Sequence, residues 1–217
     1  MLPFVIFPPG KLSTAIAKPF NVIATGPSRG GTSLFGSLLH ELGFYLGQRV
    51  HPVTFENLDF ADIAHDERIW DVRWQELIVE LNQRTPGWAL KLPHAMRRPD
   101  IFDRHALNPI FFVMVRNFLP TIASLMKFDE TYKETLFDFR RGYEHFKFFF
   151  EPLFSNLQAL TAPVVFCNYE LAMADLQKFV KIFCQLVAIP KTPEEINAII
   201  LGMRRHREQY ANSERHQ

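Results

Sequence analysis

The sequence predicts an α/β fold of three layers, in which helices flank a central parallel sheet. Short apolar runs alternate with longer segments of helical periodicity, and these runs are nearly continuous in apolar residues, as strands covered on both faces are. The chain has 217 residues, 47% of them hydrophobic, which is enough for one full core. We therefore expect a single domain over 1–217, with a leader at 1–19 and a C-terminal helix or tail at 194–217.

The first expected strand is "FNVIAT" at 20–25, and it ends at Gly26. The glycine-rich turn "GPSRGGTS" follows at 26–33, and "TSLFGSLLHELG" then places leucines at helical spacing as far as Gly43. Free N–H groups and the positive end of the helix dipole face such a turn, so it favours a bound anion.

Three more strands are expected, each followed by a helical segment. They are "WALKL" at 88–92, "PIFFVMVR" at 109–116 and "APVVFCNYE" at 162–170. Strands separated by helices form βαβ units, and sheets of this kind bind their ligands at the carboxyl ends of the parallel strands. We therefore look for functional residues where each strand ends.

Composition limits the classes of partner. The chain has 24 Lys and Arg against 23 Asp and Glu, so its formal net charge of +1 attracts neither nucleic acid nor an anionic membrane. No run reaches the roughly 20 apolar residues of a membrane helix, and "MLPFVIFPPG" lacks the basic start of a signal peptide. Cys167 and Cys184 have no C-x-x-C spacing, which argues against a disulfide framework and a zinc site. We expect a cytoplasmic protein; its oligomeric state is not readable.

The turn at 26–33 nearly fits G-x-x-x-x-G-K-[ST], the pattern of the ATP-binding P-loop, so a P-loop-type fold is expected. Gly26 and Gly31 have the required spacing, but Thr32 replaces the lysine, and the nearest cation is Arg29. Neither "FFVMVR" nor "VVFCN" ends in the aspartate with which P-loop enzymes usually hold Mg²⁺. A small-molecule kinase that uses Mg-ATP therefore stays an alternative without an identified metal ligand.

A second anion site is indicated after the third strand. That strand ends in Arg116, and Ser124 follows eight residues later in the next expected helix. A guanidinium binds phosphate oxygens bidentately, so an arginine and a hydroxyl brought together here could hold a phosphate. An ordinary solvated or salt-bridged arginine is the alternative.

These segments resemble, in order, the motifs of the sulfotransferase superfamily, in particular its bacterial members. "TGPSRGGTSL" resembles the loop for the 5′-phosphosulfate, with Gly30 in place of the usual serine. "FENLDF" resembles the segment that follows the first helix, and "GWALKLPH" resembles a W-x-x-K-x-P strand. "VMVRNFLPTIASLMK" resembles the 3′-phosphate motif, and "VVFCNYELAM" resembles a late Y-E-x-L segment, so the resemblance covers about residues 20–190.

The resemblance implies that the donor is 3′-phosphoadenosine 5′-phosphosulfate and that the product is adenosine 3′,5′-bisphosphate. It implies in-line, metal-independent transfer to a hydroxyl or amine acceptor. The residues it assigns to the 5′ side of the donor are Arg29, Gly30, Gly31, Thr32 and Ser33. Those it assigns to the 3′-phosphate and the adenine are Arg116, Ser124, Tyr169, Arg204 and Arg205. A core tyrosine and a solvated helix face are the alternatives for Tyr169 and for the two late arginines.

The general base is where this sequence departs from the family pattern. Cytosolic members use a histidine in a K-x-H motif, whereas here Lys91 is followed by leucine and proline before His94. Other members use a glutamate after the first helix, so Glu56 is the first candidate, His94 the second and His51 the third. Lys91 and Arg29 are expected to neutralise charge on the leaving phosphate. A carboxylate at a helix N-terminus and a turn histidine are the ordinary alternatives for Glu56 and His94.

The acceptor is not readable from the sequence. The aromatic segments 43–75 and 143–154 could cover an acceptor cleft and suit a carbohydrate or an apolar small molecule, but phenylalanines at helical spacing also fit a core. Gly30 and the displaced His94 leave open a third hypothesis, a degenerate fold of this kind that binds nucleotide without catalysis.

Overall fold

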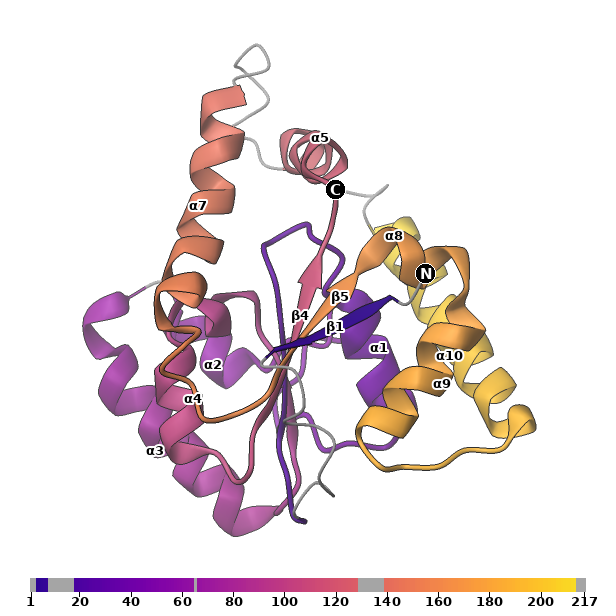
Figure 1. Ribbon diagram of the computed structural model, residues 1–217, viewed down its shortest axis with the longest axis horizontal. Coiled ribbons are helices and arrows are strands. Elements are labelled where there is room, and N and C mark those ends of the chain that lie inside the picture. The colour runs from indigo at the N-terminus through magenta and orange to yellow at the C-terminus, as the bar shows by residue number, and fades with distance from the viewer. Residues whose placement is uncertain (1–2, 8–17, 65, 129–138, 214–217) are drawn as a thin grey trace.

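The computed structural model describes residues 3–7, 18–64, 66–128 and 139–213. At its centre is a five-stranded sheet in the order β1-β5-β4-β2-β3, with helices on both faces (Figure 1). Strands β2 to β5 are parallel, and β1 runs antiparallel to β5. The strands are β1 (Phe4–Phe7), β2 (Val22–Thr25), β3 (Ala89–Lys91), β4 (Ile110–Val115) and β5 (Val164–Asn168). The predicted α/β fold and its four parallel strands are confirmed.

The sheet separates two hydrophobic cores. The helices against one face are α1 (Ser33–Glu41), α8 (Tyr169–Ala174), α9 (Leu176–Leu186) and α10 (Pro193–Ser213). The elements against the other are α2 (Leu58–Ile63), α3 (Trp70–Arg84), the 3₁₀ helix η2 (Pro93–Arg97), α4 (Pro99–His105) and α7 (Phe139–Asn156). The 3₁₀ helix η1 (Glu67–Ile69) precedes α3, and α5 (Phe118–Phe128) follows β4. None of the helices among the described residues is long and apolar enough to cross a membrane.

Strand β4 explains why the expected strands are apolar throughout. Phe112 and Met114 pack into the core of α1, α9 and α10, whereas Phe111 and Val113 pack into the opposite core. Successive side chains of a strand point to opposite faces, so a strand with a core on each face needs apolar residues at every position.

The register of the sheet brings the strand ends together. Ala24 in β2 lies opposite Lys91 in β3 on one side and Phe112 in β4 on the other. Because these strands are parallel, the loop that leaves β2 begins beside Lys91 and beside the end of β4. The carboxyl edge of the sheet is therefore where the predicted functional segments meet.

Part of the predicted leader at 1–19 is a strand that the sequence analysis did not predict. Strand β1 pairs with β5, and the Phe4 ring stacks on Phe179 with 5.3 Å between ring centroids. The run is only four residues long, and its partner lies near the other end of the chain, so no local pattern indicated it. Residues 8–17 lie outside the described part of the chain.

Both cysteines are buried and free, so the expectation of no disulfide is confirmed. Cys167 belongs to β5 and Cys184 to α9. Burial raises the pKa of both thiols, which keeps them protonated and unreactive at neutral pH.

Phe4→Ala tests whether β1 belongs to the core. Removing this buried ring should lower the free energy of unfolding by about 3 kcal/mol, because the change leaves a cavity against Phe179. Val5→Ala on the same strand is the control; Val5 is 67% exposed, and its loss should cost less than about 0.5 kcal/mol. Urea denaturation measures both, and equal losses would contradict the packing of β1.

Candidate functional site

The loop at 26–33 makes a tight turn between β2 and α1. The N–H of Gly30 donates to the carbonyl oxygen of Pro27 at 2.9 Å. Gly31 has φ +88°, and a Cβ there would lie 2.4 Å from the Tyr169 ring. Position 31 therefore requires glycine for two reasons, its left-handed backbone and the ring against it.

Glycine at position 30, where the motif that the loop resembles has a serine, has a structural reason in this turn. A Cβ at position 30 would lie 2.7 Å from the Pro27 carbonyl oxygen and 2.9 Å from Pro27 Cγ. Both distances are too short for a real side chain, so the turn as it stands accepts only glycine there. Gly30 is buried and does not line the pocket described below.

The start of α1 offers backbone donors. Leu34 N–H donates to the Gly31 carbonyl and Phe35 N–H to the Thr32 carbonyl. Among the described residues, the N–H groups of Gly31, Thr32 and Ser33 have no hydrogen-bond acceptor. A helix start of this kind attracts anions through its N–H groups and its dipole.

A pocket of about 790 Å³ opens at this edge of the sheet. Gly31, Thr32 and Ser33 lie in its wall. Its cationic lining residues are Arg29, Lys91, Arg116, Arg204 and Arg207. Among the lining side chains that the structure describes, Glu56 supplies the carboxylate. With four arginines, one lysine and one carboxylate in the described part of its lining, the pocket has a local positive charge that the net charge of the chain does not show.

Lys91 and Glu56 form an ion pair at the pocket wall. The Lys91 ammonium donates to Glu56 Oε1; its side chain is 2% exposed, and that of Glu56 is 28% exposed. Burial lowers the pKa of Lys91, and the charge of Arg29 lowers it further, while the Glu56 carboxylate acts in the opposite direction. The pair thus places a proton donor and a carboxylate side by side in the same pocket.

The loop that carries Glu56 is closed by hydrogen bonds of His51. His51 Nδ1 accepts from the N–H groups of Val53 and Thr54, at 3.2 and 3.0 Å. The backbone N–H of His51 also donates to the backbone carbonyl oxygen of Glu56 at 2.8 Å. His51, the third candidate base, is therefore outside the pocket lining and instead fixes the backbone beside the first candidate.

The second predicted anion site lies against the glycine-rich loop. Arg29 Nε donates to Ser124 Oγ at 3.1 Å, and Arg116 Nη1 donates to the Arg29 carbonyl at 3.0 Å. The Arg116 guanidinium lies over the Tyr169 ring, 4.9 Å from its centroid. Arg116 Nε is buried and has no partner among the described residues. The structure thus gathers Arg29, Arg116, Ser124 and Tyr169 in the pocket wall, in contact with one another.

Besides Gly30 and His51, two further predicted residues do not line the pocket. His94 lies in η2, where its ring contacts Trp70 and Phe149 at 6.3 and 5.6 Å between centroids, because Pro93 takes the lining position and begins the 3₁₀ turn. Arg205 is exposed on α10 and is not part of the pocket lining, whereas the neighbouring Arg204 lines the pocket.

The sequence analysis missed Arg207 and His206, which also line the pocket. Arg204 and Arg207 are three residues apart on α10, and this spacing puts two side chains on one helix face. The spacing was readable in "RRHRE", but nothing local indicated that this face meets the carboxyl edge of the sheet.

No protein-family model matches this chain, and no curated protein matches it. The likeness to sulfotransferases therefore rests on the sequence motifs alone.

Gly31→Ala measures the close contact with Tyr169, and Gly43→Ala is its control. Both glycines have positive φ, but nothing lies within 4 Å of a Cβ at position 43. Gly43→Ala should cost about 1–2 kcal/mol from the backbone alone, and Gly31→Ala should cost clearly more. Urea denaturation measures the free energy of unfolding of both variants. Equal losses would show that the Tyr169 ring moves aside at no cost in stability.

Glu56→Gln and Lys91→Met test the buried charge pair. Glu56→Gln leaves the Lys91 ammonium without its carboxylate and should cost about 2–3 kcal/mol at neutral pH. Lys91→Met removes the buried charge while keeping an apolar stem, so it should cost less.

The Glu56→Gln deficit should shrink as the pH rises. The folded-state pKa of Lys91 is below the ordinary lysine value of 10.5, so between the two values the unfolded chain binds more protons and stability increases with pH. Without Glu56 the folded pKa falls further, which widens this window. Urea denaturation at several pH values up to about 10 should show that the stability deficit of Glu56→Gln shrinks with rising pH, whereas that of Lys91→Met does not. A Glu56→Gln deficit that is independent of pH would contradict this prediction.

Proposed function

We propose that this protein is a sulfotransferase that moves the sulfuryl group of 3′-phosphoadenosine 5′-phosphosulfate to a hydroxyl or amine acceptor. The observation that carries the proposal is one pocket with two places for an anion and a lysine–carboxylate pair in its wall. The first place is the start of α1, and the second is Arg116 with Ser124. A nucleotide phosphorylated at both its 3′ and 5′ positions needs two such places, whereas ATP needs one continuous cradle.

The residues of the pocket fit this donor. The N–H groups of Gly31, Thr32 and Ser33 suit the 5′-phosphosulfate, because they lack acceptors among the described residues. Arg116 Nε is buried and has no hydrogen-bond partner among the described residues, so it could donate to a 3′-phosphate oxygen. Charge-assisted hydrogen bonds of this kind are stronger than neutral ones.

Tyr169 contacts the glycine-rich loop and Arg116, so adenine stacking is only part of its proposed role. One part of its ring lies against Gly31, and the Arg116 guanidinium lies over the ring. Tyr169 therefore positions Arg116 beside the loop, and what remains of its surface in the pocket is available to the base of the nucleotide.

The Lys91–Glu56 pair suits the transfer step. The bound donor supplies a sulfuryl group, and its transfer breaks the bond from sulfur to the bridging oxygen of the 5′-phosphate as a new bond to the acceptor forms. Glu56 takes the proton from the acceptor hydroxyl or amine. Lys91 and Arg29 stabilise the negative charge that develops on the leaving phosphate. The lysine also orients the carboxylate, because the two groups are hydrogen bonded in the free protein.

The first test is calorimetric binding of adenosine 3′,5′-bisphosphate and of ATP, with and without Mg²⁺. We expect the bisphosphate to bind without Mg²⁺ and ATP to bind much more weakly, since ATP has no 3′-phosphate for Arg116. Preference for Mg-ATP would replace the proposal with a kinase. Binding of neither nucleotide would favour a degenerate fold.

Arg116→Ala assigns the 3′-phosphate. The variant should bind adenosine 3′,5′-bisphosphate at least about 10-fold more weakly, the loss expected for hydrogen bonds to a charged group, while binding of adenosine 5′-phosphate changes little. Arg205→Ala is the matched control, because Arg205 is exposed and outside the pocket lining. An equal loss for both nucleotides would count against this assignment.

A further inference from the structure

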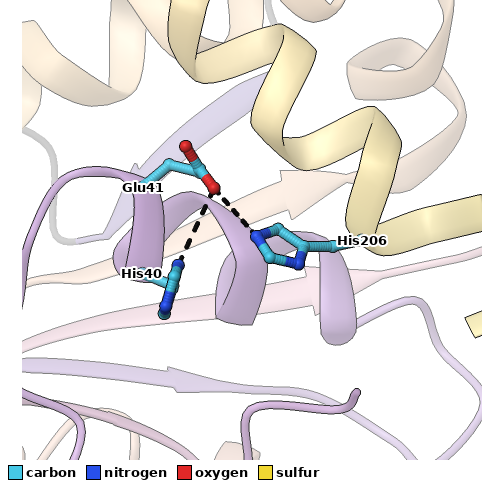
Figure 2. A group of neighbouring side chains, drawn as sticks. All are labelled: His40, Glu41 and His206. Carbon is cyan, nitrogen blue, oxygen red and sulfur yellow. Dashed lines mark hydrogen bonds and ion pairs between the residues drawn. The ribbon is translucent and has the colours of Figure 1, made fainter. Parts of the chain in front are cut away.

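Three side chains that commonly bind metals meet between α1 and α10. They are His40 and Glu41, at the C-terminal end of α1, and His206 on α10, and Figure 2 shows both imidazoles directed at the Glu41 carboxylate. We propose that His40, Glu41 and His206 bind one Zn²⁺ ion. Two imidazoles and a carboxylate are a donor set that zinc accepts, with a further position left for water. The site is separate from the transfer chemistry proposed above.

The distances among the three groups are close to those that zinc needs. His206 Nε2 lies 2.8 Å and His40 Nδ1 lies 3.7 Å from Glu41 Oε1. Bonds of about 2.0–2.2 Å to a tetrahedral ion place two ligand atoms about 3.3 Å apart. All three ligand atoms already lie within 4.8 Å of one another, so small side-chain rotations are sufficient.

The surroundings hold these side chains in place before any ion arrives. The Phe55 ring lies 5.1 Å from the His40 ring and 4.8 Å from the His206 ring, measured between centroids. Gly202 on α10 leaves room for the carboxylate, because a Cβ there would lie 2.1 Å from Glu41 Cδ. A preorganised ligand set loses less conformational entropy on binding.

The tautomer of His206 sets the expected affinity. In the free protein, a proton on Nε2 can donate to Glu41 Oε1. Zinc bound at Nε2 places the proton of the neutral ring on Nδ1, which is buried without a hydrogen-bond partner among the described residues. This cost, together with a half-exposed His40, leads us to expect weaker binding than at a site whose ligating histidines are buried and hydrogen bonded at the other ring nitrogen.

Zinc at this position would link two segments that are distant in sequence. Glu41 and His206 are 165 residues apart. His206 also lines the pocket, between Arg204 and Arg207. The ion would therefore tie the helix that begins at the glycine-rich loop to the helix that supplies the late cations.

The test is zinc titration of the metal-stripped full chain, without nucleotide, against a chromophoric chelator. We expect one equivalent of Zn²⁺ to bind wild type and His105→Gln alike; His105, on α4, is a half-buried histidine outside the group. His40→Gln and His206→Gln should each weaken binding at least about 10-fold. Cobalt in the same site should give the intense visible absorption of a tetrahedral complex.

Zinc affinity unchanged in His40→Gln and His206→Gln, or the absence of a one-to-one complex in wild type, would overturn the assignment. Circular dichroism without metal checks that each variant folds. If His206→Gln does not fold, His40→Gln decides alone, because the His40 side chain is 53% exposed and its loss leaves no cavity. Zinc binds the folded chain, so it should also raise the Tm of wild type and of His105→Gln but not of His40→Gln.

Discussion

The passage of the 26–33 loop between β4 and α8 is the constraint on which the site depends. A Cβ at Gly26 would lie 2.7 Å from the Met114 carbonyl oxygen, and one at Gly31 would overlap the Tyr169 ring. At these two points the backbone itself is in contact with its neighbours. The loop cannot move away from the sheet edge without losing these contacts, so the start of α1 stays beside the ends of β4 and β5. Arg116, the residue after β4, can then donate to the loop carbonyl at Arg29.

A second constraint is electrostatic. Lys91 ends the edge strand β3 and is almost fully buried, and a buried ammonium is unfavourable unless it is paired. Its partner Glu56 comes from a loop that has no place in the sheet, so the ion pair fastens that loop to the strand end. Phe55, next to Glu56, packs against both histidine rings at the junction of α1 and α10. One short loop thus connects the pocket wall with the proposed zinc ligands.

The positive charge of the pocket is a tertiary property. Its cations come from the β2–α1 loop, from the ends of β3 and β4, and from α10. Elsewhere on the surface, arginines pair with carboxylates, as Arg49 does with Asp59 and Asp62. A chain with formal net charge +1 can therefore present a strongly cationic cavity, because charges of opposite sign are sorted in space and not along the sequence.

The sequence by itself determined the α/β class, the four parallel strands and the position of the glycine-rich turn, because these follow from local apolar periodicity and from the backbone freedom of glycine. The rule that ligands bind at strand ends pointed to Arg116, and likeness to a family motif pointed to Lys91; both line the pocket. Glu56 was found by likeness to a family motif, and its contact with Lys91 came only from the fold.

Tertiary structure decided the rest. Strand β1 exists because β5 offers it an edge and Phe179 offers Phe4 a ring, and neither partner is near in sequence. His94 turns toward α3 and α7 because η2 begins at Pro93, which takes the lining position in the pocket. The meeting of His40 and Glu41 with His206 depends on how α10 packs on α1. Contacts between distant segments arise from packing of whole elements, and local sequence patterns carry no record of that packing.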